Sequence, residues 1–194
     1  MTPTINECYT FVFKGLLVDE ALDRAGRKVR ILSEISHETI AKAVSIDLLD
    51  ENAVDAAKKM GVVYTAIAAF ETSVRNLISK TLLENKGANW WEEAVSEKIR
   101  SYAAQRFEDE KKTRWHTQRG EDPITYTTLA QLHSIIHNNW DIFEAYVQND
   151  DWARGVFDVV ERSRNVIMHS GVLDQRDIDR LGIYIRDWIK QVGA

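Results

Sequence analysis

Hydrophobic residues recur at steps of three and four along most of the chain, which is the spacing of one face of an α-helix. The pattern is clearest between about residues 50 and 84, where an apolar seam should pack against other helices. The seam consists of Val63, Ile67, Phe70, Val74 and Leu77. Only two prolines, Pro3 and Pro123, and nine glycines interrupt the 194 residues. The sequence therefore predicts an all-α protein that folds as a compact helical bundle.

Helix-start and helix-stop signals divide the rest of the chain. We expect a second helix from about Asn89 to Arg114, with Glu92 completing a capping box. A loop around Pro123 should separate it from two shorter helices, at residues 129–138 and 140–148.

Two further helices complete the prediction. Asp150 or Asp151 should cap a helix that reaches about His169 and stops at Gly171. Asp174, with Asp177 three residues later, should open the last helix, which runs to about Val192. Residues 11–30 also read as an amphipathic helix, so we expect residues 1–50 to form an N-terminal helical extension and residues 51–194 to form the main domain.

Composition places the chain among ordinary globular proteins. It has 25 Lys and Arg against 30 Asp and Glu, a net charge of −5, and 44% hydrophobic residues. No apolar run approaches the 18 or so residues that span a bilayer, and the start of the chain lacks a signal-peptide pattern. The lone cysteine, Cys8, excludes an intrachain disulfide and a multi-cysteine zinc site. We expect a soluble cytoplasmic protein with no membrane association.

Candidate chemistry gathers in residues 161–171, ERSRNVIMHSG. On a helix Asn165 and His169 share a face, whereas Arg164 and His169 stand about 140° apart. Arg164 and His169 converge only if the helix ends there, which Gly171 favours. An Arg that clamps phosphate and a His that titrates near neutral pH suit an anion site. The alternative to an anion site is an ordinary helix end with a capping Asn and a cation that the helix dipole favours at the C-terminus.

The same residues carry a resemblance. The R-x-x-x-x-H pattern with Asn after the Arg, the flanking RNVIMHSGVL and DIDRLGIYIRDWIKQVG, and the upstream AFETSVRNLI and NNWDIF resemble the HEPN superfamily over residues 60–193. The similar branch is the one found in a eukaryotic nuclear mRNA-surveillance endoribonuclease and in stand-alone bacterial proteins.

The resemblance implies a homodimer whose two motifs form one composite, metal-independent RNase site without a cofactor. His169 would be the general acid or base, Arg164 would stabilise charge on the phosphate, and Asn165 would orient the His or bond the phosphate. The products would carry 2′,3′-cyclic phosphate ends. Family relatives of this kind serve as toxins or anti-phage effectors, which implies an antitoxin or regulatory partner protein. A catalytically silent RNA- or nucleotide-binding module and a partner-recruiting module are the alternatives.

Glu71 and Arg75 form a second polar pair, four residues apart beside the apolar seam. The resemblance implies that this pair faces the same cleft and positions the catalytic residues. The alternative is a boundary salt bridge that contributes only about a few tenths of a kcal/mol.

Residues 98–119 hold seven Lys or Arg against three acidic residues. Cations beside aromatic rings suit contact with single-stranded RNA, which makes four residues candidates for RNA binding. They are Lys111, Lys112, Arg114 and Trp115. A solvated helix face that runs into a loop is the alternative.

Two other patterns are weighed against simpler interpretations. His133, His137 and Asp141 recur every four residues, but the bend expected at residues 138–140 favours ordinary surface histidines over a metal site. Trp188 extends an apolar stripe on the last helix that suits the core or a dimer contact equally well.

Overall fold

The computed structural model describes residue 14 and residues 36–193. All regular elements within residues 36–193 are helices, which confirms the all-α prediction. Cys8 and the helix predicted at residues 11–30, apart from residue 14, lie outside the described residues. The chain divides into two compact units, Met1–Glu51 and Asn52–Ala194, and each is considered by itself.

The described part of the first unit contains one short α-helix and one 3₁₀ turn. Helix α2 (His37–Ala43) starts at Ser36, whose hydroxyl accepts a hydrogen bond from the Thr39 amide at 3.1 Å. The turn η1 (Ile46–Leu48) follows. Neither element buries a side chain.

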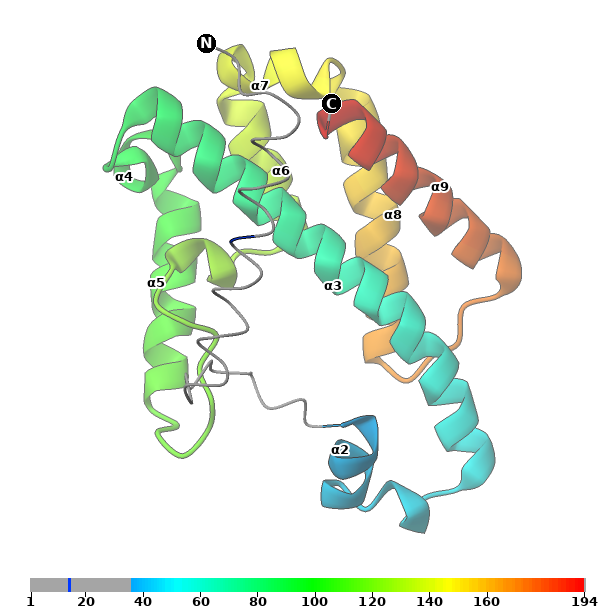
Figure 1. Cartoon of the computed structure of the whole chain (residues 1–194). Coiled ribbons are helices and arrows are strands. Elements are labelled where there is room, and N and C mark those ends of the chain that lie inside the picture. The colour runs from blue at the N-terminus through cyan, green and yellow to red at the C-terminus, as the bar shows by residue number, and fades with distance from the viewer. Residues whose placement is uncertain (1–13, 15–35, 194) are drawn as a thin grey trace. The chain divides into compact units, whose positions relative to one another are not determined.

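The second unit is built around α3 (Glu51–Lys86), a helix of 36 residues that begins at the boundary between the units. In Figure 1 α3 runs across the bundle, with α8 and α9 on one side and α4 and α5 on the other. The elements after α3 are α4 (Trp90–Ala94), α5 (Glu97–Lys111), η2 (Pro123–Tyr126), α6 (Leu129–Asn138), α7 (Trp140–Val147), α8 (Asp150–Met168) and α9 (Gln175–Val192).

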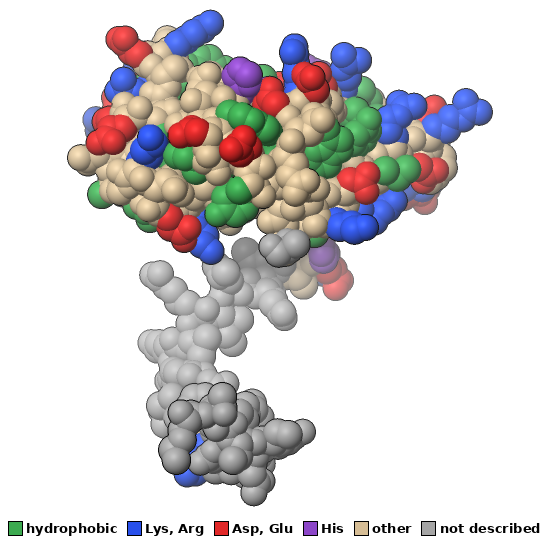
Figure 2. Space-filling view, turned by 90° about the horizontal axis from the view of Figure 1, so that it is seen from above, with side chains coloured by type: hydrophobic (Ala, Val, Ile, Leu, Met, Phe, Trp, Pro, Cys, Tyr) green, Lys and Arg blue, Asp and Glu red, His purple; other side chains and the backbone are tan. Residues whose placement is uncertain are grey.

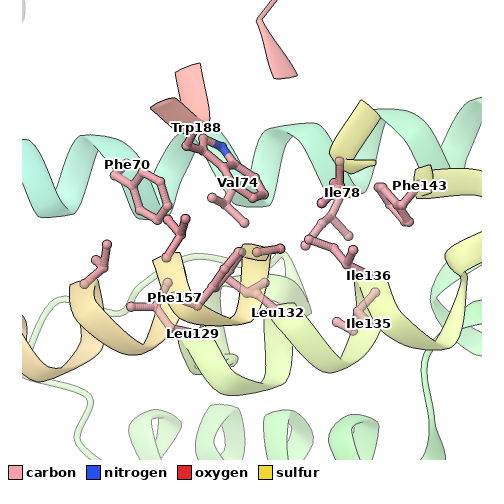
Figure 3. Close-up of a cluster of buried hydrophobic side chains, with 14 of the residues drawn as sticks. Phe70, Val74, Ile78, Leu129, Leu132, Ile135, Ile136, Phe143, Phe157 and Trp188 are labelled. Carbon is pink, nitrogen blue, oxygen red and sulfur yellow. The ribbon is translucent and has the colours of Figure 1, made fainter. Parts of the chain in front are cut away.

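The apolar seam of α3 is the centre of the core, although only Ile67, Phe70 and Val74 of the five predicted residues are buried. Val63 and Leu77 are partly buried, and Ile78 continues the buried face of the seam. Figure 3 shows Phe70, Val74 and Ile78 facing side chains of α6 and α8, with Trp188 of α9 beside Phe70. The rings of Phe70 and Trp188 meet edge to face with centroids 5.8 Å apart, and those of Phe157 and Trp188 do so at 5.2 Å. Trp188 is only 1% exposed, so its stripe serves the core rather than a dimer contact.

Several predicted boundaries agree with the structure. The helix at residues 129–138 coincides with α6, and a bend at Asn139 separates α6 from α7. Asp174 caps α9 by accepting a hydrogen bond from the Asp177 amide at 2.9 Å. Helix α3 begins one residue after the predicted start and ends two residues after the predicted end.

The helix expected at residues 89–114 was predicted wrongly. It is two helices, because Val95 is extended and buried, and Ser96 starts α5 anew. Asn89 makes no side-chain cap, and the capping box lies instead at Thr128 and Gln131. Burial of Val95 in the core outweighs the helical continuity that the local sequence favours.

The cap of α8 was also predicted wrongly. Asn149, not Asp150 or Asp151, caps α8 by accepting a hydrogen bond from the Trp152 amide at 2.8 Å. Asp150 is the first residue of the helix, and its carboxylate contacts α6 instead. The side chain of Asp150, which the sequence assigns to the cap, therefore contacts another helix instead.

Asn139 joins two parts of the bundle that are distant in the sequence. Its side-chain amide is buried and donates to the carbonyl oxygen of Ala94 at 2.9 Å and to that of Ile135 at 2.8 Å. These two bonds hold the end of α4 against the bend between α6 and α7.

We expect Asn139→Ala to lower the free energy of unfolding by about 1–3 kcal/mol, because two carbonyl groups lose their donor in a buried place. Urea denaturation followed by circular dichroism measures the change. Asn138→Ala is the matched control, because Asn138 is the adjacent residue and is exposed. Equal stability of the two variants would contradict this role of Asn139.

Candidate functional site

The last turn of α8 carries the predicted motif. Arg164 and Asn165 lie in the helix, and His169 is its C-cap residue. The His169 amide donates to the carbonyl oxygen of Asn165 at 3.2 Å. The helix thus ends at His169, as the convergence of Arg164 and His169 requires.

A tight backbone turn stops the helix. Ser170 adopts the left-handed conformation with φ 61°, and its amide donates to the Ile167 carbonyl at 3.0 Å. The Gly171 amide donates to the Val166 carbonyl at 2.8 Å, which completes a Schellman motif. A Cβ on Gly171 would lie 2.7 Å from Cγ1 of Val166, so this close approach requires glycine.

Glu71 of α3 links the second polar pair to the motif. Its Oε1 lies 3.5 Å from Nε of Arg164, and its Oε2 lies 3.5 Å from Nη1 of Arg75. The Glu71 side chain is 15% exposed, and that of Arg164 is 38% exposed. One partly buried carboxylate therefore stands between two guanidinium groups, one from α3 and one from α8.

Arg75 extends this network to the segment before α6. Its Nη2 donates to the carbonyl oxygen of Thr127 at 3.2 Å, whereas its buried Nε has no hydrogen-bond partner. Thr127 directly precedes the Thr128 cap of α6. No sequence pattern predicts this contact, because the acceptor is a backbone carbonyl that any residue supplies.

The remaining two motif residues are open to solvent. Asn165 and His169 are exposed, and no described residue hydrogen bonds to either side chain. With Arg164, Arg75 and Glu71 charged, the network has a formal charge of +1. An exposed imidazole and a guanidinium five residues apart at the end of one helix are groups that can bind a phosphate.

Acidic side chains within the predicted RNA-binding segment neutralise part of its positive charge. Nζ of Lys111 lies 3.0 Å from Glu108 and 4.0 Å from the ring centroid of Phe107, and Nζ of Lys112 lies 2.6 Å from Asp109. The hydrogen bond that Lys112 donates to Asp109 raises the pKa of Lys112. Both acidic partners lie three residues before the lysines on the same helix.

Two other members of the segment lie after α5. Arg114 is exposed and has no acidic partner among the described residues. Trp115 is 85% exposed, with its ring against that of His116. Arg114 and Trp115 are therefore the two members of the set that remain open to contact with a ligand.

The two histidines of α6 pair with a different acid from the one in the sequence pattern. Nε2 of His133 lies 3.1 Å from Oδ1 of Asp150, and Nδ1 of His137 lies 2.9 Å from Oδ2. Asp141 is exposed on α7. Within the described residues no group of three His, Cys, Asp or Glu side chains is arranged to hold a metal ion. Sequence spacing missed Asp150 because it belongs to another helix.

Charged side chains of both signs are spread over the surface. On the face drawn in Figure 2, acidic, basic and hydrophobic side chains lie interspersed. No helix in the described part of the chain is long and apolar enough to cross a membrane.

The all-helical fold and the Arg-Asn-x-x-x-His motif at the end of α8 together define the class of protein. The sequence model of the family described as Swt1-like HEPN matches residues 65–193, which is more than half of the chain. The chain therefore belongs to this HEPN family, and the predicted resemblance is confirmed. Membership suggests an RNase-type or otherwise RNA-related function. No curated protein and no solved structure matches the chain significantly.

We expect Gly171→Ala to destabilise the protein by about 1–3 kcal/mol, because the new Cβ has no room beside Val166. The backbone movement that the new Cβ forces should also displace His169 and lower any activity that depends on this residue. Thermal unfolding and RNA cleavage measure the two effects. Gly155→Ala is the control: a Cβ added to this glycine within α8 would meet nothing within 4 Å, so the change should stabilise the helix. Similar effects of the two substitutions would contradict the steric argument.

Proposed function

We propose that this protein is a metal-independent endoribonuclease. One observation carries the proposal beyond family membership: Glu71 of α3 contacts Arg164 of the HEPN motif, while His169 ends the same helix as Arg164 with its imidazole exposed. The arrangement holds an Arg in place and leaves a His free, as acid–base chemistry on a phosphodiester requires.

The proposed reaction is an attack of a ribose 2′-oxygen on the adjacent phosphorus. A base removes the 2′-hydroxyl proton, the 2′-O–P bond forms, and the P–O5′ bond breaks. An acid protonates the leaving 5′-oxygen, which gives a 2′,3′-cyclic phosphate and a 5′-hydroxyl end. His169 acts as the base or the acid, Arg164 stabilises charge on the phosphoryl oxygens, and Asn165 orients the His or bonds the phosphate.

A second copy of the chain completes this site in our proposal. The reaction needs both an acid and a base, and each protomer supplies one motif histidine. Hydrophobic side chains flank His169 in exposed positions, which suits a surface that another copy covers. They are Val166 at 40%, Met168 at 54% and Val172 at 60% exposure.

Outside the motif, the end of α5 and the segment after it contact the substrate in this proposal. Arg114 and Trp115 are exposed and offer a cation and a ring for stacking, and Lys111 and Lys112 add charge where an RNA phosphate displaces their acidic partners. We further propose a toxin or anti-phage role restrained by an antitoxin or regulatory protein, a role inherited from the family resemblance alone.

The deciding test incubates end-labelled tRNA and mRNA with the full chain in EDTA. Wild type should cleave and leave cyclic phosphate ends, whereas His169→Ala should lose at least about 100-fold in rate, in line with the usual contribution of acid–base catalysis of about 10²–10⁴. Both proteins should first be shown to be folded dimers by circular dichroism and light scattering. Products with 3′-hydroxyl ends, or a strict need for magnesium, would refute the mechanism. RNA binding without cleavage by either protein would favour the silent module.

We expect Glu71→Gln to lower the cleavage rate at least about tenfold, because Arg164 loses its carboxylate contact. The free energy of unfolding should change by less than about 1 kcal/mol, because both ion pairs of Glu71 are long, at 3.5 Å, and glutamine keeps the shape and an oxygen acceptor. Glu84→Gln is the matched control, since Glu84 is exposed on the same helix. Loss of stability with unchanged cleavage would assign Glu71 a purely structural role.

A further inference from the structure

A pocket lined by both charged and apolar side chains lies away from the HEPN motif. It has a volume of about 590 Å³ and lies among the start of α5, the length of α6 and the first half of α8. Arg154, on its α8 wall, stands ten residues before Arg164, which is about 15 Å along the helix. The pocket is therefore separate from the site proposed for cleavage.

Asp150 holds two imidazoles at one wall of this pocket. Its Oδ1 lies 3.1 Å from Nε2 of His133, and its Oδ2 lies 2.9 Å from Nδ1 of His137. The two rings stack at an interplanar angle of 27°. Both carboxylate oxygens of Asp150 therefore face the imidazoles. Because Nδ1 of His137 faces Asp150, its Nε2 is left for a ligand, and this side chain is 61% exposed.

Two cations line the pocket without an acidic partner. Lys98 of α5 and Arg154 of α8 are both exposed, and no described carboxylate lies within 4.0 Å of either. Asp158 is the other acidic residue of the lining. The formal charges of Lys98, Arg154, Asp150 and Asp158 cancel, and the two cations are the groups left without a carboxylate partner within 4.0 Å.

We propose that this pocket binds a phosphate monoester, on a free nucleotide or at the 5′ end of an RNA. Arg154 supplies a planar fork that matches two phosphate oxygens, Lys98 supplies a point charge, and His137 leaves its Nε2 for a hydrogen bond with the phosphate. A volume of about 590 Å³ holds more than an inorganic ion and leaves room for an attached nucleoside. This binding function goes beyond the cleavage reaction and does not depend on it.

The test is calorimetric titration of the full chain in EDTA at about pH 7. The probes are inorganic phosphate, adenosine 5′-monophosphate, and a 2′-O-methyl oligoribonucleotide with either a 5′-phosphate or a 5′-hydroxyl. Arg154→Gln should weaken binding at least about tenfold, because the phosphate loses its two-pronged donor. Arg162→Gln is the matched control, because Arg162 is exposed on the same helix outside this pocket and should change affinity less than about twofold.

The probes separate the two sources of phosphate. Tight binding of the monophosphate supports a free nucleotide, and preference for the 5′-phosphorylated oligonucleotide supports an RNA end. Equal binding of the 5′-hydroxyl oligonucleotide would overturn the proposal. So would equal effects of the two arginine substitutions, binding that appears only when zinc replaces EDTA, or no binding of any probe at about 10 mM. His169→Ala should bind the probes normally, so that failure of the cleavage proposal and failure of this one are distinguishable.

Discussion

Burial of the apolar seam of α3 is the constraint that determines how the helices of the second unit pack. Ile67, Val74 and Ile78 of this helix are fully buried against α6, α8 and α9. Complete burial of such side chains contributes about 1.5–3 kcal/mol each, so the seam fixes how the three later helices pack against α3. Glu71 and Arg75 lie at the edge of the same helix and are carried into place by it. The candidate site is thus positioned by the core rather than by loops.

Glu71 lies at the edge of the core, where it contacts two arginines. A carboxylate that is 15% exposed between two guanidinium groups is neutralised by them, which offsets the cost of removing it from water. Such a pair contributes little net stability when its contacts are long, as both 3.5 Å contacts are. Its effect is to restrict where Arg164 lies. We regard Glu71 as a positioning residue, and the unpartnered buried Nε of Arg75 indicates that this network is not fully satisfied within the described residues.

The two histidine positions differ in what surrounds them. His169 is exposed at a helix end with no described side-chain partner, whereas His133 and His137 are held by one carboxylate at the wall of a pocket. A free imidazole suits proton transfer to a bound substrate, and an oriented one suits a fixed hydrogen bond. The same residue type therefore supports two different proposals, cleavage at one end of α8 and phosphate binding at the other.

The helical class, the seam of α3, the cap at Asp174 and the end of α8 could all be predicted from the sequence, because periodicity and capping are local properties of the chain. The motif around Arg164 and His169 also carried the family resemblance. The break at Val95, the contact between Glu71 and Arg164, and the pairing of His133 and His137 with Asp150 emerge only in the folded chain. These features depend on contacts between residues far apart in the sequence, since packing overrides local propensity where a buried side chain or a charge finds a partner on another helix.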